Sequence, residues 1–190
     1  SRVQRLGISN DNVEFASTTS ADDIATTIRD KKHQLVIVDS MQTIALAELS
    51  SAPGSVSQIT NAANVLIQAA KQSGTALILV GHVTKEGSIA GPKVLEHLVD
   101  VVLSIDGDRY AGFKVLRAVK NRYGSTLEAA VFDMTSQGLI PVENPSAALL
   151  AERQNADGSV ILATMEGNRP LLVEIQALVN KTHFGYPKRT

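Results

Sequence analysis

Leu35-Val36-Ile37-Val38-Asp39-Ser40 is an uninterrupted apolar run that ends in a carboxylate. Its four apolar residues do not alternate with polar ones, so they predict a strand buried on both faces of a parallel sheet. An Asp at the carboxyl end of such a strand resembles the Walker B motif. In that motif the carboxylate holds the water shell of Mg²⁺ while the metal bridges nucleotide phosphates. The alternative, from these six residues alone, is that Asp39 only turns the chain after a strand.

Helices and a second strand flank this run in the rhythm of a parallel α/β sheet. The capping-box-like start Ser20-Ala21-Asp22-Asp23 predicts a helix over about 21–32. A turn-forming stretch at 50–56 precedes a second helix that stops at Gly74. The apolar face of that helix carries Ile59, Ala62, Ala63, Leu66, Ala69 and Ala70. Residues 75–80 predict a second buried strand, which ends in Gly81-His82.

The pattern changes after residue 100, where short strands alternate with turns. Strands are predicted at 101–105, 113–122, 129–134 and 139–142, and they read as hairpins that give the sheet an antiparallel edge. A short helix is predicted at 92–98 and another at 146–153, and a further hairpin has strands at 159–165 and 171–179. We place a domain boundary near 150–158. The residues beyond it are too few for an independent core, so we expect them to be the beginning of a truncated domain.

Composition sets limits on the function. The 190 residues hold 18 Lys and Arg, 19 Asp and Glu and no Cys, which excludes disulfides, Cys-based zinc sites and a thiol nucleophile. The net charge of −1 gives no overall attraction to nucleic acid, so such binding must come from local clusters. No apolar run approaches the roughly 18 residues of a spanning helix. The chain begins at Ser1 without a Met or a signal peptide, so we expect an internal fragment of a cytoplasmic protein.

Two cationic segments are candidates for binding phosphate. Residues 114–122 carry four cations and no acid, which suits a nucleotide or a DNA backbone, although a solvated edge strand is the alternative. Residues 84–93 combine Lys85 and Lys93 with two glycines, which suits a phosphate chain, although a plain connecting loop is the alternative. His82, at the end of its strand, could sense a γ-phosphate or only make a local hydrogen bond. The four His show no metal-ligand spacing.

The phosphate loop that normally accompanies a Walker B strand is missing from the chain. No segment matches G-x-x-x-x-G-K-[ST], and Gly is nowhere followed by Lys. Either the protein is not an ATPase or that loop lies upstream of Ser1.

Taken in order, several segments resemble one family, the RadA (Sms) family of bacterial DNA-repair ATPases in the RecA-like superfamily. Besides the Walker B run, the resemblance rests on residues 51–58 and on 80–97. Lys120-Asn121-Arg122-Tyr123-Gly124 matches the hallmark K-N-R-F-G, with Tyr in place of Phe. Residues 166–179 resemble the opening of a Lon-protease-like domain.

The resemblance implies a RecA-like mostly parallel sheet at 1–150, followed at 151–190 by the truncated start of the Lon-like domain. It implies a DNA-dependent ATPase that uses ATP and Mg²⁺ and drives branch migration of recombination intermediates. The partners implied are single-stranded and branched DNA, other copies of the chain in a ring, here taken as a hexamer, and the recombinase RecA. The family's Walker A loop, catalytic Glu and four-Cys zinc module lie upstream, so we expect this chain alone not to hydrolyse ATP.

The resemblance also gives each candidate residue a role. Asp39 is the Walker B acid that holds Mg²⁺ through water, and Ser40 beside it orients the carboxylate. His82 leads from the γ-phosphate to the second DNA-binding loop, where Lys85 and Lys93 contact phosphates. Lys120 and Arg122 are catalytic cations that reach the nucleotide of the neighbouring subunit. The segment between Ser40 and Ser57 matches the first DNA loop, yet it holds no cation.

Three other interpretations remain open from the sequence. The first is a DNA-binding or oligomerisation domain on a RecA-like scaffold without turnover, which a G-K-[ST] loop upstream would argue against. The second is a replicative-type helicase of the same fold, against which the K-N-R motif and the Lon-like opening count. The third is a Lon-type protease, which requires a Ser–Lys dyad downstream.

Overall fold

The computed structural model describes residues 12–82, 90–107, 113–151, 153 and 157–177. Contacts divide the chain into two compact units, one that ends at Val102 and one that continues from Leu103. We describe each unit by itself. The predicted boundary near 150–158, between an ATPase core and a second domain, stays a prediction.

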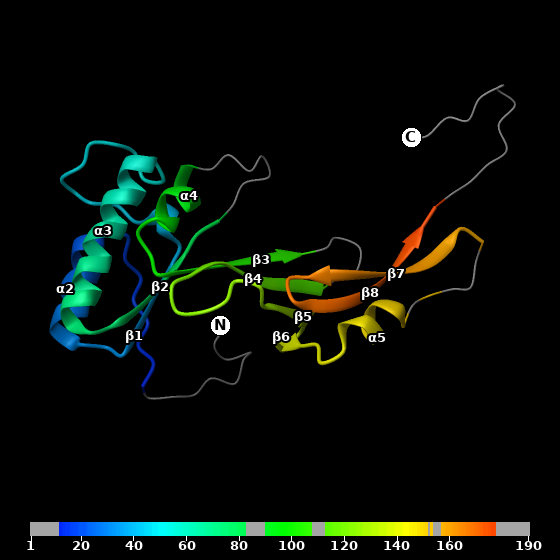
Figure 1. Ribbon diagram of the computed structural model, residues 1–190. Helices are drawn as coiled ribbons and strands as arrows, with labels where there is room; N and C mark the ends of the chain where they lie inside the picture. Colours follow the sequence, from blue (N-terminus) through cyan, green and yellow to red (C-terminus); the bar gives the residue numbers. More distant parts are fainter. Residues whose placement is uncertain (1–11, 83–89, 108–112, 152, 154–156, 178–190) are drawn as a thin grey trace, which may run out of the picture. The chain divides into compact units, whose positions relative to one another are not determined.

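The first unit is a parallel pair of strands with helices packed on one side (Figure 1). Strand β1 (Leu35–Asp39) pairs in parallel with β2 (Ala76–Val80), so that Leu35 lies opposite Ala76 and Asp39 opposite Val80. Helices α2 (Ala21–Lys31) and α3 (Val56–Ser73) lie against each other. A short 3₁₀ helix, η1 (Met41–Thr43), follows β1, and α4 (Ala90–Glu96) packs against α3.

The predicted helix ends and core positions of this unit are confirmed. The Ser20 side chain accepts a hydrogen bond from the Asp23 amide at 3.2 Å, which caps α2. Ser55 caps α3 in the same way, and Gly74 ends that helix at φ +69°, a conformation that glycine adopts without strain. All six apolar positions predicted for α3 are buried. Local patterning therefore fixes both helices.

The prediction that β1 is buried on both faces is wrong for the described residues. Val38 is 5% exposed and faces α2 and α3, whereas Leu35 and Ile37 are 49% and 59% exposed. Ile78, which lies opposite Ile37, is 47% exposed. Successive strand residues point to opposite faces, and the helices described here cover one face only. A continuous apolar run predicts that both faces of the strand are covered, but the helices described here cover one face.

The second unit contains an antiparallel sheet. Its strand order is β3 (Val101–Gly107), β4 (Phe113–Asn121), β5 (Ala129–Thr135) and β6 (Gly138–Pro141). The β4–β5 and β5–β6 pairs are antiparallel. All four strands were predicted. They were expected to form an antiparallel edge of the parallel sheet, whereas their hydrogen bonds join them into a separate sheet. Each strand of this sheet is hydrogen-bonded to its neighbour along the chain.

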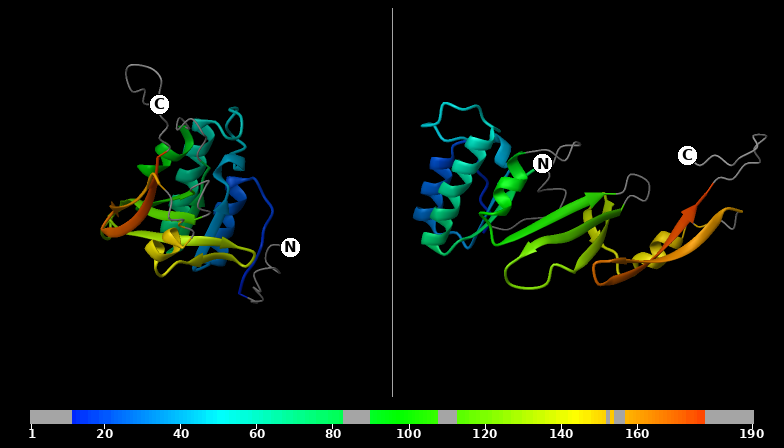
Figure 2. Two further views of the ribbon diagram at one scale, coloured as in Figure 1. Left: turned by 90° about the vertical axis from the view of Figure 1, so that its right-hand side faces the viewer. Right: turned by 45° about the horizontal axis from the view of Figure 1, so that its top comes forward.

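A helix and a hairpin complete the second unit (Figure 2). Helix α5 (Pro145–Leu150) begins at Asn144, whose side chain accepts from the Ala147 amide, and it packs on β8. It ends three residues before the predicted end at 153. Strands β7 (Ser159–Glu166) and β8 (Arg169–Gln176) pair in antiparallel register. The amide of Asn168 in their turn donates to the Leu127 carbonyl at 2.7 Å, which ties the hairpin to the segment before β5.

Candidate functional site

Asp39 lies where the sequence predicted it, at the carboxyl end of β1. The residue is exposed, and its carboxylate makes no hydrogen bond or ion pair within the part of the chain that the structure describes. Ser40 is 9% exposed, and its carbonyl accepts from both the amide and the hydroxyl of Thr43, at 3.1 and 2.9 Å. The Asp39–Ser40 peptide bond is cis. The Asp39 carboxylate is therefore open to solvent, and the backbone that follows it is held by the hydrogen bonds to the Ser40 carbonyl.

His82 lies two residues after the end of β2, and it is exposed. Gln42, in η1, donates from its Nε2 to the His82 carbonyl at 3.3 Å. The same hydrogen bond therefore links the segment after β1 to the segment after β2. The Oε1 atom of Gln42 is buried and has no hydrogen-bond partner. Gln42 was not among the predicted site residues, and the only available signal was a polar residue three positions after Asp39.

One buried side chain contacts the backbone of the loop after η1 at several points. Gln58, in α3, is 1% exposed. Its Oε1 accepts from the Leu46 amide at 2.9 Å. Its Nε2 lies 3.3, 3.1 and 3.0 Å from the carbonyl oxygens of Leu46, Leu49 and Ser51. Gln58 was also not predicted as a site residue, although an amide on the apolar face of a helix, beside Ile59, marks it as unusual.

The two predicted DNA-binding lysines have different outcomes. Lys85 lies outside the described residues, as does most of the predicted loop at 84–91. Lys93 is described and exposed, but it lies in α4 and not in a loop. Helix α4 runs from Ala90 to Glu96, slightly earlier than the predicted 92–98.

The Lys120-Asn121-Arg122 motif lies at the end of β4 and in the turn that follows. Lys120 is half-buried and Arg122 is exposed. Asn121 shapes the turn, because its Oδ1 accepts from the Tyr123 amide at 3.0 Å and its Nδ2 donates to the Ser125 carbonyl at 3.3 Å. The middle residue of the motif thus has a structural role that the sequence did not reveal. The motif belongs to the second unit and Asp39 to the first, so each is described in its own unit.

Arg117, within the cationic run at 114–122, forms an ion pair with an acid. Arg117 Nη1 lies 3.0 Å from Asp106 Oδ2 on β3. The cationic run has no acid along its own strand, but the neighbouring strand supplies one. An exposed pair of this kind contributes little to stability, about 0–1 kcal/mol. It does lower the positive charge that the strand offers to a phosphate.

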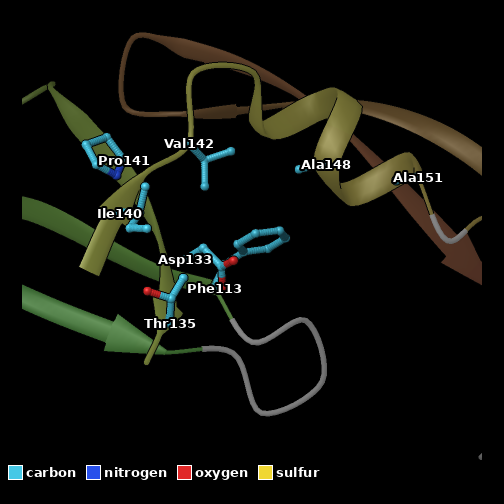
Figure 3. Close-up of a pocket in the computed structure, with 8 residues that line it drawn as sticks. All are labelled: Phe113, Asp133, Thr135, Ile140, Pro141, Val142, Ala148 and Ala151. Atoms are coloured by element: carbon cyan, nitrogen blue, oxygen red, sulfur yellow. The ribbon is translucent and has the colours of Figure 1, made fainter. Parts of the chain in front are cut away.

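An open hollow of about 440 Å³ lies in the second unit between the β4–β6 strands and α5 (Figure 3). Its lining is Phe113, Asp133, Thr135, Ile140, Pro141, Val142, Ala148 and Ala151. None of the predicted site residues lines this hollow. Among the described residues, no cluster of three or more His, Asp or Glu could hold a metal ion, and no helix is long and apolar enough to cross a membrane.

Comparison with known proteins gives matches along the whole chain. The chain is 49% identical over 189 residues to DNA repair protein RadA of Pseudomonas aeruginosa, which covers 99% of the chain and 42% of that protein. It is 50% identical to RadA of Bacillus subtilis and 47% identical to RadA of Streptococcus pneumoniae. The chain belongs to the RadA family. It spans about two fifths of the length of these relatives, and no family model matches it.

Two solved structures are distantly similar. A KaiC-like protein from Pyrococcus horikoshii is 17% identical, with a TM-score of 0.47, and the match covers 64% of this chain and 55% of that one. The RadB recombinase is 18% identical, with a TM-score of 0.46 and coverage of 65% and 59%.

Proposed function

We propose that the full-length protein is a DNA-dependent ATPase of recombinational repair, which processes recombination intermediates and drives their branch migration. The match to proteins named DNA repair protein RadA, over 99% of the chain, supports the biological role. The observation that carries the chemistry is the exposed carboxylate of Asp39, at the carboxyl end of a strand that lies in parallel beside a second one. Open α/β sheets bind nucleotides at that edge.

The residues around Asp39 fit a nucleotide-bound Mg²⁺. An exposed carboxylate without a competing partner can hold the water shell of Mg²⁺, and nucleotide phosphates supply the remaining ligands. Mg²⁺ neutralises charge on those phosphates when ATP is bound. The hydrogen bonds to the Ser40 carbonyl fix the backbone beside the carboxylate. We expect Ser40 to orient Asp39 and the RecA-like core to supply its phosphate loop from outside this chain.

The carboxyl end of β2 connects this site to DNA in the proposal. Gln42 holds the His82 carbonyl, so the His82 side chain projects from a fixed backbone position. We assign His82 to sensing the γ-phosphate and passing its state to residues 84–93. Lys85 and Lys93 then contact DNA phosphates. In a ring, here a hexamer, Lys120 and Arg122 reach the nucleotide of the neighbouring subunit.

Replacement of Asp39 by Asn tests the nucleotide site in the full-length protein. The change is nearly isosteric and removes the charge, so we expect DNA-stimulated ATP hydrolysis to be abolished while the fold is kept. Asp30→Asn is the matched control, because Asp30 is exposed at the far end of α2, and it should hydrolyse ATP normally. Turnover of Asp39→Asn at the control rate contradicts the assignment. A wild-type protein that binds DNA without any hydrolysis favours the non-hydrolysing scaffold instead.

A further inference from the structure

The segment between η1 and α3 is part of the stretch between Ser40 and Ser57 that, by the family resemblance, matches the first DNA loop, yet it holds no cation. Between residues 44 and 55, the only charged residue is Glu48, which is exposed. A loop of this composition cannot bind a phosphate through side-chain charge. Its backbone, however, is arranged in an unusual way by Gln58.

Gln58 draws three carbonyl oxygens of the loop toward α3. They belong to Leu46, Leu49 and Ser51, and each lies within 3.3 Å of the Gln58 Nε2. The Leu46 amide also points inward, to Oε1. Because Gln58 is almost completely buried, these hydrogen bonds fix the inner side of the loop.

The direction of a carbonyl sets the direction of the next N–H. In a trans peptide the C=O of one residue and the N–H of the following residue point in opposite directions. The Asp39–Ser40 bond is the only cis bond in the described part of the chain, so the three peptides here are trans. The N–H groups of Ala47, Ser50 and Ala52 therefore point away from Gln58.

These three N–H groups are available to a ligand. None of them has a hydrogen-bond partner within the residues that the structure describes. Ala47, Ser50 and Ala52 are all exposed, and their small side chains leave the backbone accessible. Outward-pointing N–H groups that donate to no carbonyl of the chain can bind a phosphate oxygen by a hydrogen bond, without any charged side chain.

We propose that Gln58 is a positioning residue that turns the N–H groups of Ala47, Ser50 and Ala52 outward, and that these groups bind phosphates of single-stranded DNA. The proposal rests on the proposed function, because it names how the loop would contact DNA. It accounts for a DNA loop that lacks a cation. Glu48 weakens the contact by repulsion and does not supply it.

Proline at position 47 tests the proposal, because proline has no N–H. The Leu49 amide donates to the Leu46 carbonyl at 3.3 Å, which makes Ala47 the second residue of a tight turn. Proline is favoured there. Ala47→Pro therefore removes one N–H and keeps the turn, and Ala47→Ser is the matched control that keeps the N–H.

Binding of a labelled 30-nucleotide oligo-dT to the full-length protein is measured by anisotropy over a salt series. We expect Ala47→Pro to lose roughly tenfold in affinity at every salt concentration, since a hydrogen bond to a charged group is lost. The slope of log K against log salt should not change, because an N–H neutralises no phosphate and releases no counterion. Ala47→Ser should bind like the wild type.

Hydrogen exchange of the peptide spanning 46–53 gives a second measurement on the unmodified protein. DNA should slow exchange in this peptide, and wild-type exchange without DNA should be fast at positions 47, 50 and 52. If Ala47→Pro binds the oligonucleotide as tightly as the wild type, and DNA does not slow exchange in this peptide, the inference is overturned and the proposed function stands. A wild-type protein that does not bind the oligonucleotide overturns both.

Discussion

Replacement of Gln58 by Leu should release the loop between η1 and α3. The Nε2 group has two hydrogens and Oε1 accepts from Leu46, so about three of the four contacts act at one time. Each is worth about 0.5–1.5 kcal/mol net. Leu keeps the apolar volume and has a helix propensity close to that of Gln, so packing changes little. The half-exposed loop carbonyls regain some water, which leaves an expected loss of about 2–3 kcal/mol.

The assay is native-state hydrogen exchange of the full-length protein, read at the Leu46 and Leu49 amides, which donate hydrogen bonds to Gln58 Oε1 and to the Leu46 carbonyl. A loss of about 2–3 kcal/mol corresponds to roughly 30–150-fold faster exchange if the loop opens locally. Gln68→Leu is the control, because it makes the same change in the same helix at an exposed position. Equal exchange for the two variants would refute the reasoning, since it would mean that the buried amide contributes nothing that a methyl group does not.

Two further predictions concern charge. Removal of both Lys85 and Lys93 should weaken DNA binding similarly for all sequences and reduce the salt slope by up to about two, and an unaltered slope argues against phosphate contacts. Arg122→Ala should bind ATP but lose DNA-stimulated turnover, by about 10³–10⁵ for a cation supplied in trans, with Lys120→Ala less complete. Mixing Arg122→Ala with Asp39→Asn subunits should restore some activity, and co-assembled rings without any recovery contradict a shared site.

The sequence was sufficient for elements whose causes are local. Ser20 caps α2, Gly74 ends α3, and the apolar face from Ile59 to Ala70 is buried, because caps and helical spacing act within a few residues. The position of Asp39 at the end of a parallel strand followed from the same kind of pattern. Its role in holding Mg²⁺ stays a prediction.

The sequence was insufficient where the cause lies far along the chain. The exposed face of β1, with Ile37 at 59%, depends on which elements cover the sheet, and apolar residues alone do not say this. The independent antiparallel sheet depends on which strand edges meet, whereas the hairpins themselves were predictable from their turns. Gln42 and Gln58 act on carbonyls at His82 and at Leu46, Leu49 and Ser51, so their roles exist only in the folded chain.

The two glutamines show why amides suit the surroundings of the proposed nucleotide site. A buried carboxylate or ammonium group would need a charged partner, whereas an amide both donates and accepts at a much smaller cost of burial. Gln58 can therefore hold one N–H and several carbonyls from within the core, and Gln42 can link two strand ends without adding a field of its own. The carboxylate of Asp39 then stays exposed as the formal charge at the end of β1. In the proposed function, the Mg²⁺ of bound ATP would meet that carboxylate and the phosphates of DNA would meet neutral N–H donors on the loop, so that a side chain holds the metal and the backbone contacts DNA.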